Sequence, residues 1–165
     1  MPKNDNVRIR KPNRLKNYDY SENGAYFITF CVHNHDNLLG YIRNDTQATE
    51  GGRPYIKLTP LGKCVDETIK NANNDKITIN KYVVMPNHVH LIVEINTQIN
   101  TSVQYIVRNI KSYVTKFAGF AVWQKSFHDH IIRNKNDYDR IIEYVENNPK
   151  TWIEDRYYNP ANAPS

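Results

Sequence analysis

Residues 77–95, ITINKYVVMPNHVHLIVEI, decide the fold because they hold two apolar, β-branched runs on either side of a Pro-Asn pair. The first run is Ile77 to Met85 and the second is His88 to Ile95. Runs of this length and composition are typical of β-strands, and Pro86-Asn87 has the length and chemistry of a tight hairpin connection. We therefore expect two antiparallel strands that are neighbours in one sheet.

The segments on either side of this hairpin supply the other main elements. In chain order we expect a strand at 26–32, a small hairpin through 39–42 and 55–58, a helix at 59–72, a helix at 101–119, a strand at 123–132 and a helix at 135–147. The resulting order, β-α-β-β-α-β with an additional C-terminal helix, predicts an α+β fold with a ferredoxin-like antiparallel sheet. That fold carries many unrelated functions, so function has to be argued from the site.

Capping residues set the expected helix ends. Thr59-Pro60 is a helix start with Thr as N-cap and Pro at the first helical position. Thr101 and Gln104 form a capping box for the second helix, and Gly119 is its expected C-cap. The apolar stripe of that helix extends to Phe117, so we expect this face to pack on the sheet.

The length predicts a single domain, because 165 residues with 39% hydrophobic content build one core and hardly two. We place this domain at 25–152, after an N-terminal arm at 1–24 and before a loose tail at 153–165. The sequence has no apolar run of membrane-spanning length and no signal-like stretch, so we expect a cytoplasmic protein with no membrane partner. Cys31 and Cys64 lack metal or redox spacing and are expected to be reduced core residues.

The charge distribution is compatible with a polyanionic partner. The formal net charge is +5, and basic residues crowd the first sixteen positions. A charged terminus of this kind can equally be a solvated tail, and both interpretations stay open. The candidate phosphate contacts are Arg8, Arg10, Arg14 and Lys16 in the arm, and Arg108, Lys111 and Lys116 on the second helix.

His88 and His90 form a candidate metal-binding pair. Side chains alternate along a strand, so these two histidines point to the same face, with roughly 6.5 to 7 Å between their Cα atoms. That spacing lets two imidazoles converge on one ion, although a His-x-His pair can also simply hydrogen-bond to other polar groups. His128 and His130 repeat the spacing, so a closed four-histidine zinc site is an alternative.

Tyr144 and Asn148 form a second candidate pair. They lie four residues apart at the edge of the apolar stripe of the last helix, so they are neighbours on the helix surface. A phenol and a carboxamide are thereby presented together at the boundary between core and solvent. Without the histidines, the same residues are better explained as a boundary tyrosine and a helix-ending asparagine.

With these residues in view, the sequence resembles the Y1 transposase superfamily of HUH enzymes, and most closely the REP-associated tyrosine transposases. The segment KYVVMPNHVHLIVE (81–94) resembles the family's metal-binding strand, with its His-hydrophobic-His motif. The segment VWQKSFHDHIIRNKNDYDRIIEYVENNPKTW (122–152) resembles its last strand and catalytic helix. The likeness extends back to RLKNYDYSENGAYFITFCVHN (14–34) and covers nearly the whole chain.

The resemblance implies specific roles. The nucleophile falls on Tyr144 and not on Tyr138, and the metal ligands fall on His88, His90 and Asn148. The implied ion is Mg²⁺ or Mn²⁺, and the implied substrate is single-stranded DNA with a hairpin, joined to the tyrosine through a 5′ phosphate and then transferred to another strand. For such an enzyme we expect association with the nucleoid, and the protein acts as a monomer or as a homodimer. We further expect His130 to face the DNA or the rim of the site, although a purely structural histidine explains it equally well.

One competing function is a non-catalytic ferredoxin-like module that binds nucleic acid, because such sheets also present aromatic residues to RNA. The sequence has no match to the aromatic and basic pattern by which that class is identified. A zinc-stabilised structural domain built on the four histidines is the other alternative. It predicts an ion that stays bound when Asn148 is removed.

Overall fold

The computed structural model describes residues 19, 23–44, 54–97 and 101–162 of the chain. At its centre is the hairpin expected from the sequence, formed by β4 (Ile77–Val84) and β5 (His88–Ile95). The two strands pair antiparallel, with a register shift between Ile79 and Lys81. The prediction of adjacent antiparallel strands is confirmed.

Two further strands complete a four-stranded antiparallel sheet in the order β4-β5-β1-β6. β1 (Gly24–Cys31) pairs along the whole length of β5, and β6 (His128–Ile132) lies on the outer side of β1. The first and third main strands are thus central and the second and fourth are at the edges, as the split βαβ arrangement requires. The predicted α+β architecture is confirmed.

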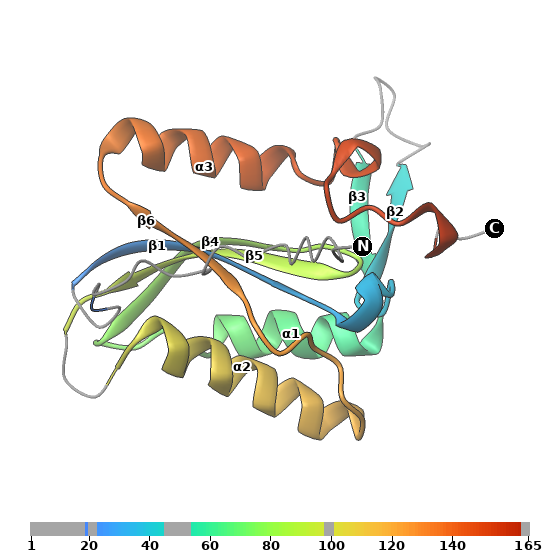
Figure 1. Ribbon diagram of the computed structural model, residues 1–165, viewed down its shortest axis with the longest axis horizontal. Helices are drawn as coiled ribbons and strands as arrows, with labels where there is room; N and C mark the ends of the chain where they lie inside the picture. The colour runs from blue at the N-terminus through green and yellow to red at the C-terminus, as the bar shows by residue number, and fades with distance from the viewer. Residues whose placement is uncertain (1–18, 20–22, 45–53, 98–100, 163–165) are drawn as a thin grey trace, which may run out of the picture.

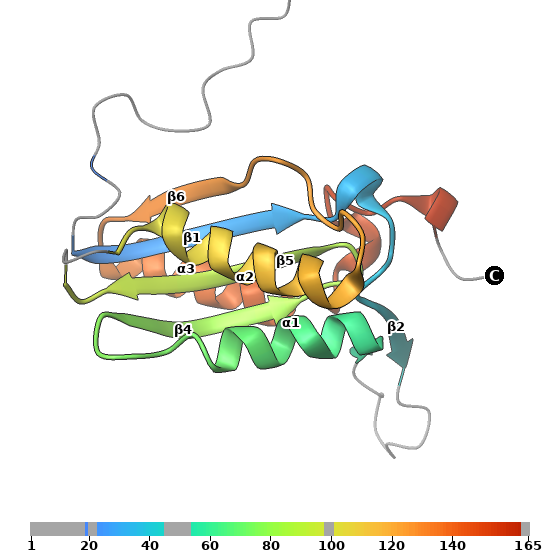
Figure 2. The ribbon, with the colours of Figure 1, turned by 90° about the horizontal axis from the view of Figure 1, so that it is seen from below.

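Three helices cover the sheet on two sides (Figures 1 and 2). α1 (Pro60–Lys70) and α2 (Val103–Ala118) lie together on one face, and α3 (Lys135–Asn147) lies alone on the other. The observed bounds of α3 equal the predicted ones, and Gly119 ends α2 with a φ of 77°, a conformation that favours glycine. None of the helices in the described ranges has the length and apolar character needed to cross a membrane.

The two faces of the sheet carry cores of unequal size. The larger core lies under α1 and α2 and takes alternate residues of the central strands, such as Ile28 of β1 and Leu91 of β5. The smaller one joins Ile92 to Ile141 and Val145 of α3. Since β5 is covered on both faces, the polar side chains that it turns toward α3 are buried as well. The candidate site therefore lies between β5 and α3.

A small separate sheet, β2 (Gly40–Asn44) paired with β3 (Pro54–Leu58), forms the second hairpin expected from the sequence. It leads directly into α1, where Gly62 packs against the backbone of Leu39. A Cβ atom on Gly62 would lie 1.8 Å from the Leu39 carbonyl oxygen, so only glycine fits there.

Four sequence expectations about these elements need correction. The last strand begins at His128 and not at Trp123, which makes only an isolated bridge to Val32. In the segment before the strand, the carbonyls of Gln124 and Ser126 accept from the Lys111 ammonium. The N-cap of α2 is Ser102, whose hydroxyl accepts from the Tyr105 amide, and not Thr101. α1 ends at Lys70 and not near Ala72. Phe117 does not pack on the sheet but is exposed, because α2 diverges from the sheet toward its C-terminal end (Figure 1).

The chain beyond α3 is packed against the rest of the domain as far as Tyr157. It forms two short 3₁₀ helices, Trp152–Glu154 and Pro160–Asn162. The side chains of Trp152 and Tyr157 are buried, and the Tyr157 carbonyl accepts a hydrogen bond from Asn87 in the β4–β5 turn. The expectation of a loose segment was therefore wrong for these residues, whose aromatic side chains give them apolar area to bury.

Candidate active site

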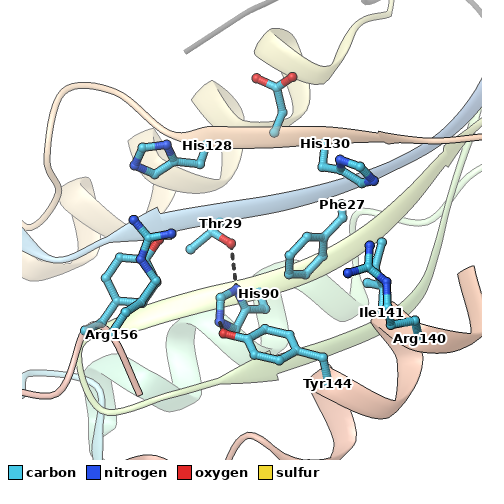
Figure 3. A pocket seen from close by; sticks show the side chains of 11 residues that line it. Phe27, Thr29, His90, His128, His130, Arg140, Ile141, Tyr144 and Arg156 are labelled. Carbon is cyan, nitrogen blue, oxygen red and sulfur yellow. Dashed lines mark hydrogen bonds between the residues drawn. The ribbon is translucent and has the colours of Figure 1, made fainter. Parts of the chain in front are cut away.

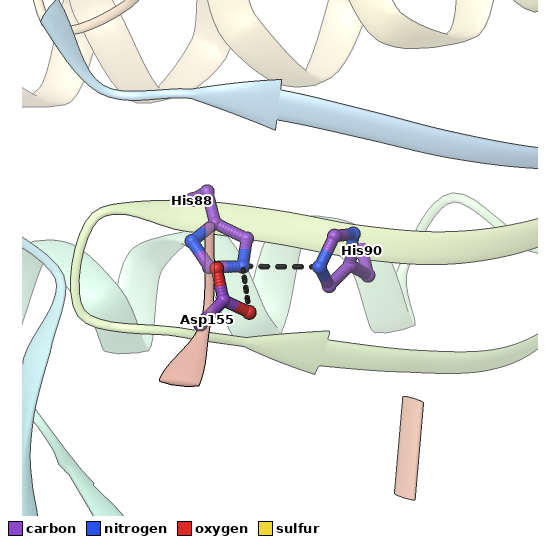
Figure 4. A group of neighbouring side chains, drawn as sticks. All are labelled: His88, His90 and Asp155. Carbon is purple, nitrogen blue, oxygen red and sulfur yellow. Dashed lines mark hydrogen bonds and ion pairs between the residues drawn. The ribbon is translucent and has the colours of Figure 1, made fainter. Parts of the chain in front are cut away.

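The histidine pair lies at the start of β5, on the face covered by α3. His88 is fully buried and His90 is 1% exposed. Their Nε2 atoms lie 3.0 Å apart, so the two imidazoles converge on one point (Figure 4). This geometry follows from strand alternation, as the sequence predicted.

Asn87 determines which nitrogen of His88 carries the hydrogen. Its Nδ2 donates to the carbonyl oxygens of His35, at 3.0 Å, and Tyr157, at 2.8 Å. Only an amide NH₂ group can serve two carbonyls, so the Asn87 Oδ1 atom must face His88 Nδ1, 2.8 Å away, and accept from it. The lone pair of His88 is thereby left on Nε2, the atom that faces His90.

His90 has an equivalent partner on β1. Its Nδ1 lies 2.6 Å from the Thr29 hydroxyl, and its ring stacks on Phe27 (Figure 3). When Nδ1 donates to the hydroxyl, a second Nε2 lone pair points at the first. In that tautomer the two lone pairs repel each other unless a cation lies beside them, so the pair could hold a metal ion.

Burial keeps both imidazoles neutral. It lowers the pKa of His88 well below its usual value, and the neighbouring His90 lowers it further. Burial likewise lowers the pKa of His90 to about 3, with a smaller contribution from the positive charge of Arg156. Neutral imidazoles are the form that binds metals, so protons do not compete with an ion at neutral pH.

Asn148 and Asp155 complete a buried polar cluster beside the histidines. Asn148, the C-cap of α3, is 1% exposed, and its Nδ2 donates to Asp155 Oδ2 at 2.9 Å. The Asn148 Oδ1 atom is buried and has no hydrogen-bond partner among the residues that the structure describes. Asp155 Oδ2 lies 3.9 Å from His88 Nε2 (Figure 4). The cluster thus offers two nitrogens and at least one uncommitted oxygen.

These side chains fit a divalent cation. In the described ranges, the only His, Cys, Asp and Glu side chains whose ligand atoms lie close enough together to hold an ion are those of His88, His90 and Asp155. His128 and His130 are not among them, so the four-histidine zinc site does not form. Imidazole nitrogens combined with carboxylate and amide oxygens suit Mn²⁺ and, with more oxygen ligands, Mg²⁺.

Tyr144 reaches the same point from the last turn of α3. Its Oη lies 3.4 Å from His90 Nε2, and its ring meets Phe27 edge-on. The side chain is 41% exposed, so the hydroxyl is accessible to a large substrate. Burial of the phenol and the nearby Asp155 carboxylate both raise its pKa, so it is protonated at neutral pH.

A pocket of about 420 Å³ opens in front of Tyr144 (Figure 3). Histidines from β6 and arginines from α3 and the C-terminal segment line it, namely His128, His130, Arg140 and Arg156. His130 Nε2 lies 2.7 Å from an Asp137 carboxylate oxygen and the side chain is 48% exposed, which places it at the rim. The pocket combines aromatic walls with cationic groups, as a site for a phosphodiester would require.

The predicted phosphate contacts lie elsewhere. Arg8, Arg10, Arg14 and Lys16 are outside the described residues. On α2, across the sheet from Tyr144, Arg108 is exposed over the ring of Tyr105, and Lys116 is also exposed.

Lys111 is different from its two neighbours on α2. Its ammonium donates to the carbonyls of Gln124 and Ser126, each at 2.9 Å. Burial lowers the pKa of this amine to about 8. Its charge is therefore already committed to holding the loop before β6.

Sequence reasoning missed several residues of this site, among them Thr29, Asn87, Asp155, Arg156 and Tyr157. Asn87 was assigned only to the turn, although its place directly before the histidine pair is a signal for an orienting role. The other signal was the aromatic content of 152–158, which is unusual for a loose tail.

Comparisons with known proteins identify relatives of this chain. The model of the IS200-like transposase family matches residues 57–148, more than half of the chain. An uncharacterised protein of Haemophilus influenzae is 32% identical over 182 residues, covering 94% of this chain and 96% of that protein. A REP-associated tyrosine transposase of Escherichia coli is 33% identical over 82 residues, 49% of each chain.

A solved structure has the same fold. The REP-associated tyrosine transposase bound to a REP hairpin superposes with a TM-score of 0.58 at 22% identity, covering 92% of each chain. The family match includes β4, β5, α2, β6 and α3, and it therefore contains the histidine pair, Tyr144 and Asn148. The chain belongs to the IS200-like transposase family.

Proposed function

We propose that this transposase is a metal-dependent endonuclease and strand transferase that acts on single-stranded DNA, with Tyr144 as its nucleophile. The observation that carries the proposal is the position of the Tyr144 hydroxyl, 3.4 Å from His90 Nε2 and at the mouth of an open pocket. The contact between Tyr144 and His90 of the same chain supports an active site formed within one chain.

His88, His90 and Asn148 are the residues that would hold the ion, Mg²⁺ or Mn²⁺. When bound, such an ion polarises a non-bridging oxygen of the scissile phosphate and stabilises the negative charge that develops there. The chain prepares for this by keeping both histidines neutral and by fixing the hydrogen of His88 on Nδ1 through Asn87, while the Thr29 hydroxyl can accept the corresponding hydrogen of His90. Asn148 adds the oxygen that these hard ions prefer.

Tyr144 would attack the phosphorus in line with the leaving group. A bond forms between its Oη and phosphorus, the bond from phosphorus to the 3′ oxygen breaks, and the DNA 5′ phosphate stays on the tyrosine. The phenol loses its proton in this step and the leaving 3′ oxygen gains one. Because the pKa of Tyr144 is raised, proton loss has to be assisted during attack.

The phosphotyrosine keeps a phosphodiester bond in place of a hydrolysed product. Attack by another 3′ hydroxyl then reverses the chemistry and joins a new strand, so the intermediate favours strand transfer over hydrolysis. This outcome is what a transposase needs.

Hairpin-bearing repeat DNA is the substrate we propose. Support comes from the solved relative, which is bound to a REP hairpin. In this chain, exposed Arg108 and Lys116 and the pocket arginines Arg140 and Arg156 are available to phosphates, and His130 lies at the rim where a strand would enter. The N-terminal Arg8, Arg10, Arg14 and Lys16 remain candidates for further phosphate contacts.

The test is a covalent-adduct assay. Wild-type protein and Tyr144→Phe are incubated with Mn²⁺ and pooled single-stranded DNA from the flanks of the protein's own gene, and denaturant-resistant adducts are separated by gel. Tyr113→Phe, which removes the hydroxyl of a tyrosine on α2 that is 62% exposed, is the matched control. We expect adducts with the wild type and the control and none with Tyr144→Phe.

Two results would contradict the proposal. An adduct that survives in Tyr144→Phe would show that another residue is the nucleophile. The second result is that wild type and variant both bind the DNA but neither forms an adduct, although an independent transposition assay shows that the pool contains the cleavage site. This result would favour a non-catalytic nucleic-acid-binding module.

A further inference from the structure

We propose that Asp155 is a positioning residue of the metal centre, whose carboxylate holds the Asn148 carboxamide with its oxygen, and not its NH₂ group, toward His88. The inference rests on the proposed function, since it assumes that the ion binds at the histidine pair. It concerns a segment that lies beyond the range matched by the transposase family model, which ends at residue 148.

The Asp155 carboxylate is buried and accepts two hydrogen bonds. Its side chain is 1% exposed, so it can satisfy its charge only through protein groups. Oδ2 accepts from Asn148 Nδ2 at 2.9 Å, and Oδ1 accepts from the Tyr157 amide at 2.7 Å. An ionised carboxylate has no hydrogen to donate, so the group that faces it must be the NH₂ group of Asn148.

The opposite side of the Asn148 amide is thereby defined. Its Oδ1 is buried and has no hydrogen-bond partner among the described residues. A buried acceptor without a partner is costly, and side-chain amides have two nearly equivalent orientations about their terminal bond. Asp155 therefore removes the alternative in which the amide turns by half a rotation.

That alternative would be harmful to metal binding. With the amide reversed, its NH₂ group would face the buried histidine pair and could donate to the lone pair on His88 Nε2. The lone pair needed for an ion would then be occupied by the protein itself. The Asp155 carboxylate prevents this and also places a negative charge 3.9 Å from His88 Nε2, where it favours a cation.

The segment that carries Asp155 also controls the other asparagine of the site. The Tyr157 carbonyl accepts from Asn87 Nδ2, and this contact sets the tautomer of His88. Trp152 packs near the His88 ring, with 5.9 Å between ring centroids. The residues after α3 therefore orient both carboxamides, Asn87 and Asn148, from one packed segment.

The first variant is Asp155→Asn, which keeps size and removes the charge. The Tyr157 amide still requires an oxygen, so the new NH₂ group would face Asn148 and force its amide to turn. Changes of this kind in the surroundings of a metal site weaken binding by about 10-fold to about 100-fold. We expect that loss in the affinity for Mn²⁺ alone, measured by calorimetry without DNA.

The second variant exchanges the two groups, Asp155→Asn with Asn148→Asp. The new amide at 155 donates to the new carboxylate at 148, whose other oxygen faces the histidines. We expect the Mn²⁺ affinity to return to within about 3-fold of the wild type, which a merely structural role does not predict. Glu154→Gln removes the same charge from an exposed neighbour and should change nothing.

The outcomes distinguish a failure of the proposed metal-dependent function from a failure of the proposed role of Asp155. If wild-type protein binds no Mn²⁺, the metal-dependent function itself is wrong. If it binds and Asp155→Asn binds equally well or more tightly, this inference alone is overturned. Loss in the single variant without recovery in the exchanged pair, both folded by near-ultraviolet circular dichroism, would also overturn it, because the carboxylate would then act only from position 155.

Discussion

Replacing Asn87 by alanine should destabilise the fold and weaken metal binding together. The Asn87 side chain is fully buried and makes three hydrogen bonds, to the carbonyls of His35 and Tyr157 and from His88 Nδ1. Removing it leaves the His88 N–H without an acceptor, which costs about 1 to 3 kcal/mol, and each lost carbonyl contact costs about 1 kcal/mol more. The expected loss in the free energy of unfolding is therefore about 3 to 5 kcal/mol.

The effect on the ion has a separate cause. Without Asn87, the hydrogen of His88 is no longer held on Nδ1, so Nε2 carries a lone pair only part of the time. Loss of an orienting partner of this type lowers metal affinity by about 10-fold to about 100-fold. The affinity for Mn²⁺ is measured by calorimetry on protein that is shown to be folded.

Urea unfolding followed by the fluorescence of Trp123 and Trp152, both buried, gives the stability change. Asn96→Ala is the control, because it removes one hydrogen bond from an exposed asparagine to Thr78 on the same sheet and should cost no more than about 0.5 kcal/mol. The reasoning would be refuted if Asn87→Ala were as stable as that control and bound Mn²⁺ as tightly as the wild type.

Three further predictions follow from other contacts. Gly62→Ala should lower the free energy of unfolding by about 3 kcal/mol or more, because its Cβ would lie 1.8 Å from the Leu39 carbonyl oxygen; a urea midpoint close to wild type would show that the two segments separate easily. Arg108→Ala should reduce the slope of log affinity for DNA against log salt by about 1, and equal slopes in wild type and Arg108→Ala would exclude this face of α2 from DNA binding. Lys111→Met should lower the stability of the protein and leave that slope unchanged, because the Lys111 ammonium binds two carbonyls. The free energy of unfolding should fall as pH drops from about 6.5 toward about 3, because burial lowers the pKa of His90 to about 3 and the unfolded chain then binds a proton that the folded protein excludes. His90→Asn should weaken this pH dependence in urea titrations at about pH 7 and about pH 4.5. An unchanged pH dependence in the variant would contradict the prediction.

Local patterns in the sequence predicted a large part of this molecule. The β4–β5 hairpin, the bounds of α3 and the small hairpin ahead of α1 agree with the structure, because each depends on periodicity or turn chemistry within a few residues. The same holds for the two parts of the site that lie within one element. His88 and His90 share a face because a strand alternates, and Tyr144 and Asn148 are neighbours because a helix has 3.6 residues per turn.

Contacts between distant segments decided the rest. Asn87 and Tyr157 are 70 positions apart, and their hydrogen bond sets the tautomer of His88. Lys111 binds the carbonyls of Gln124 and Ser126 ahead of the last strand, and no pattern in either segment predicts this contact. Sequence periodicity reports which face of an element is apolar, but it does not report which polar groups meet once two faces have packed. Only the folded chain brings the C-terminal segment onto the histidine pair, and the need to satisfy buried donors and acceptors there then fixes how the side chains of the site are oriented.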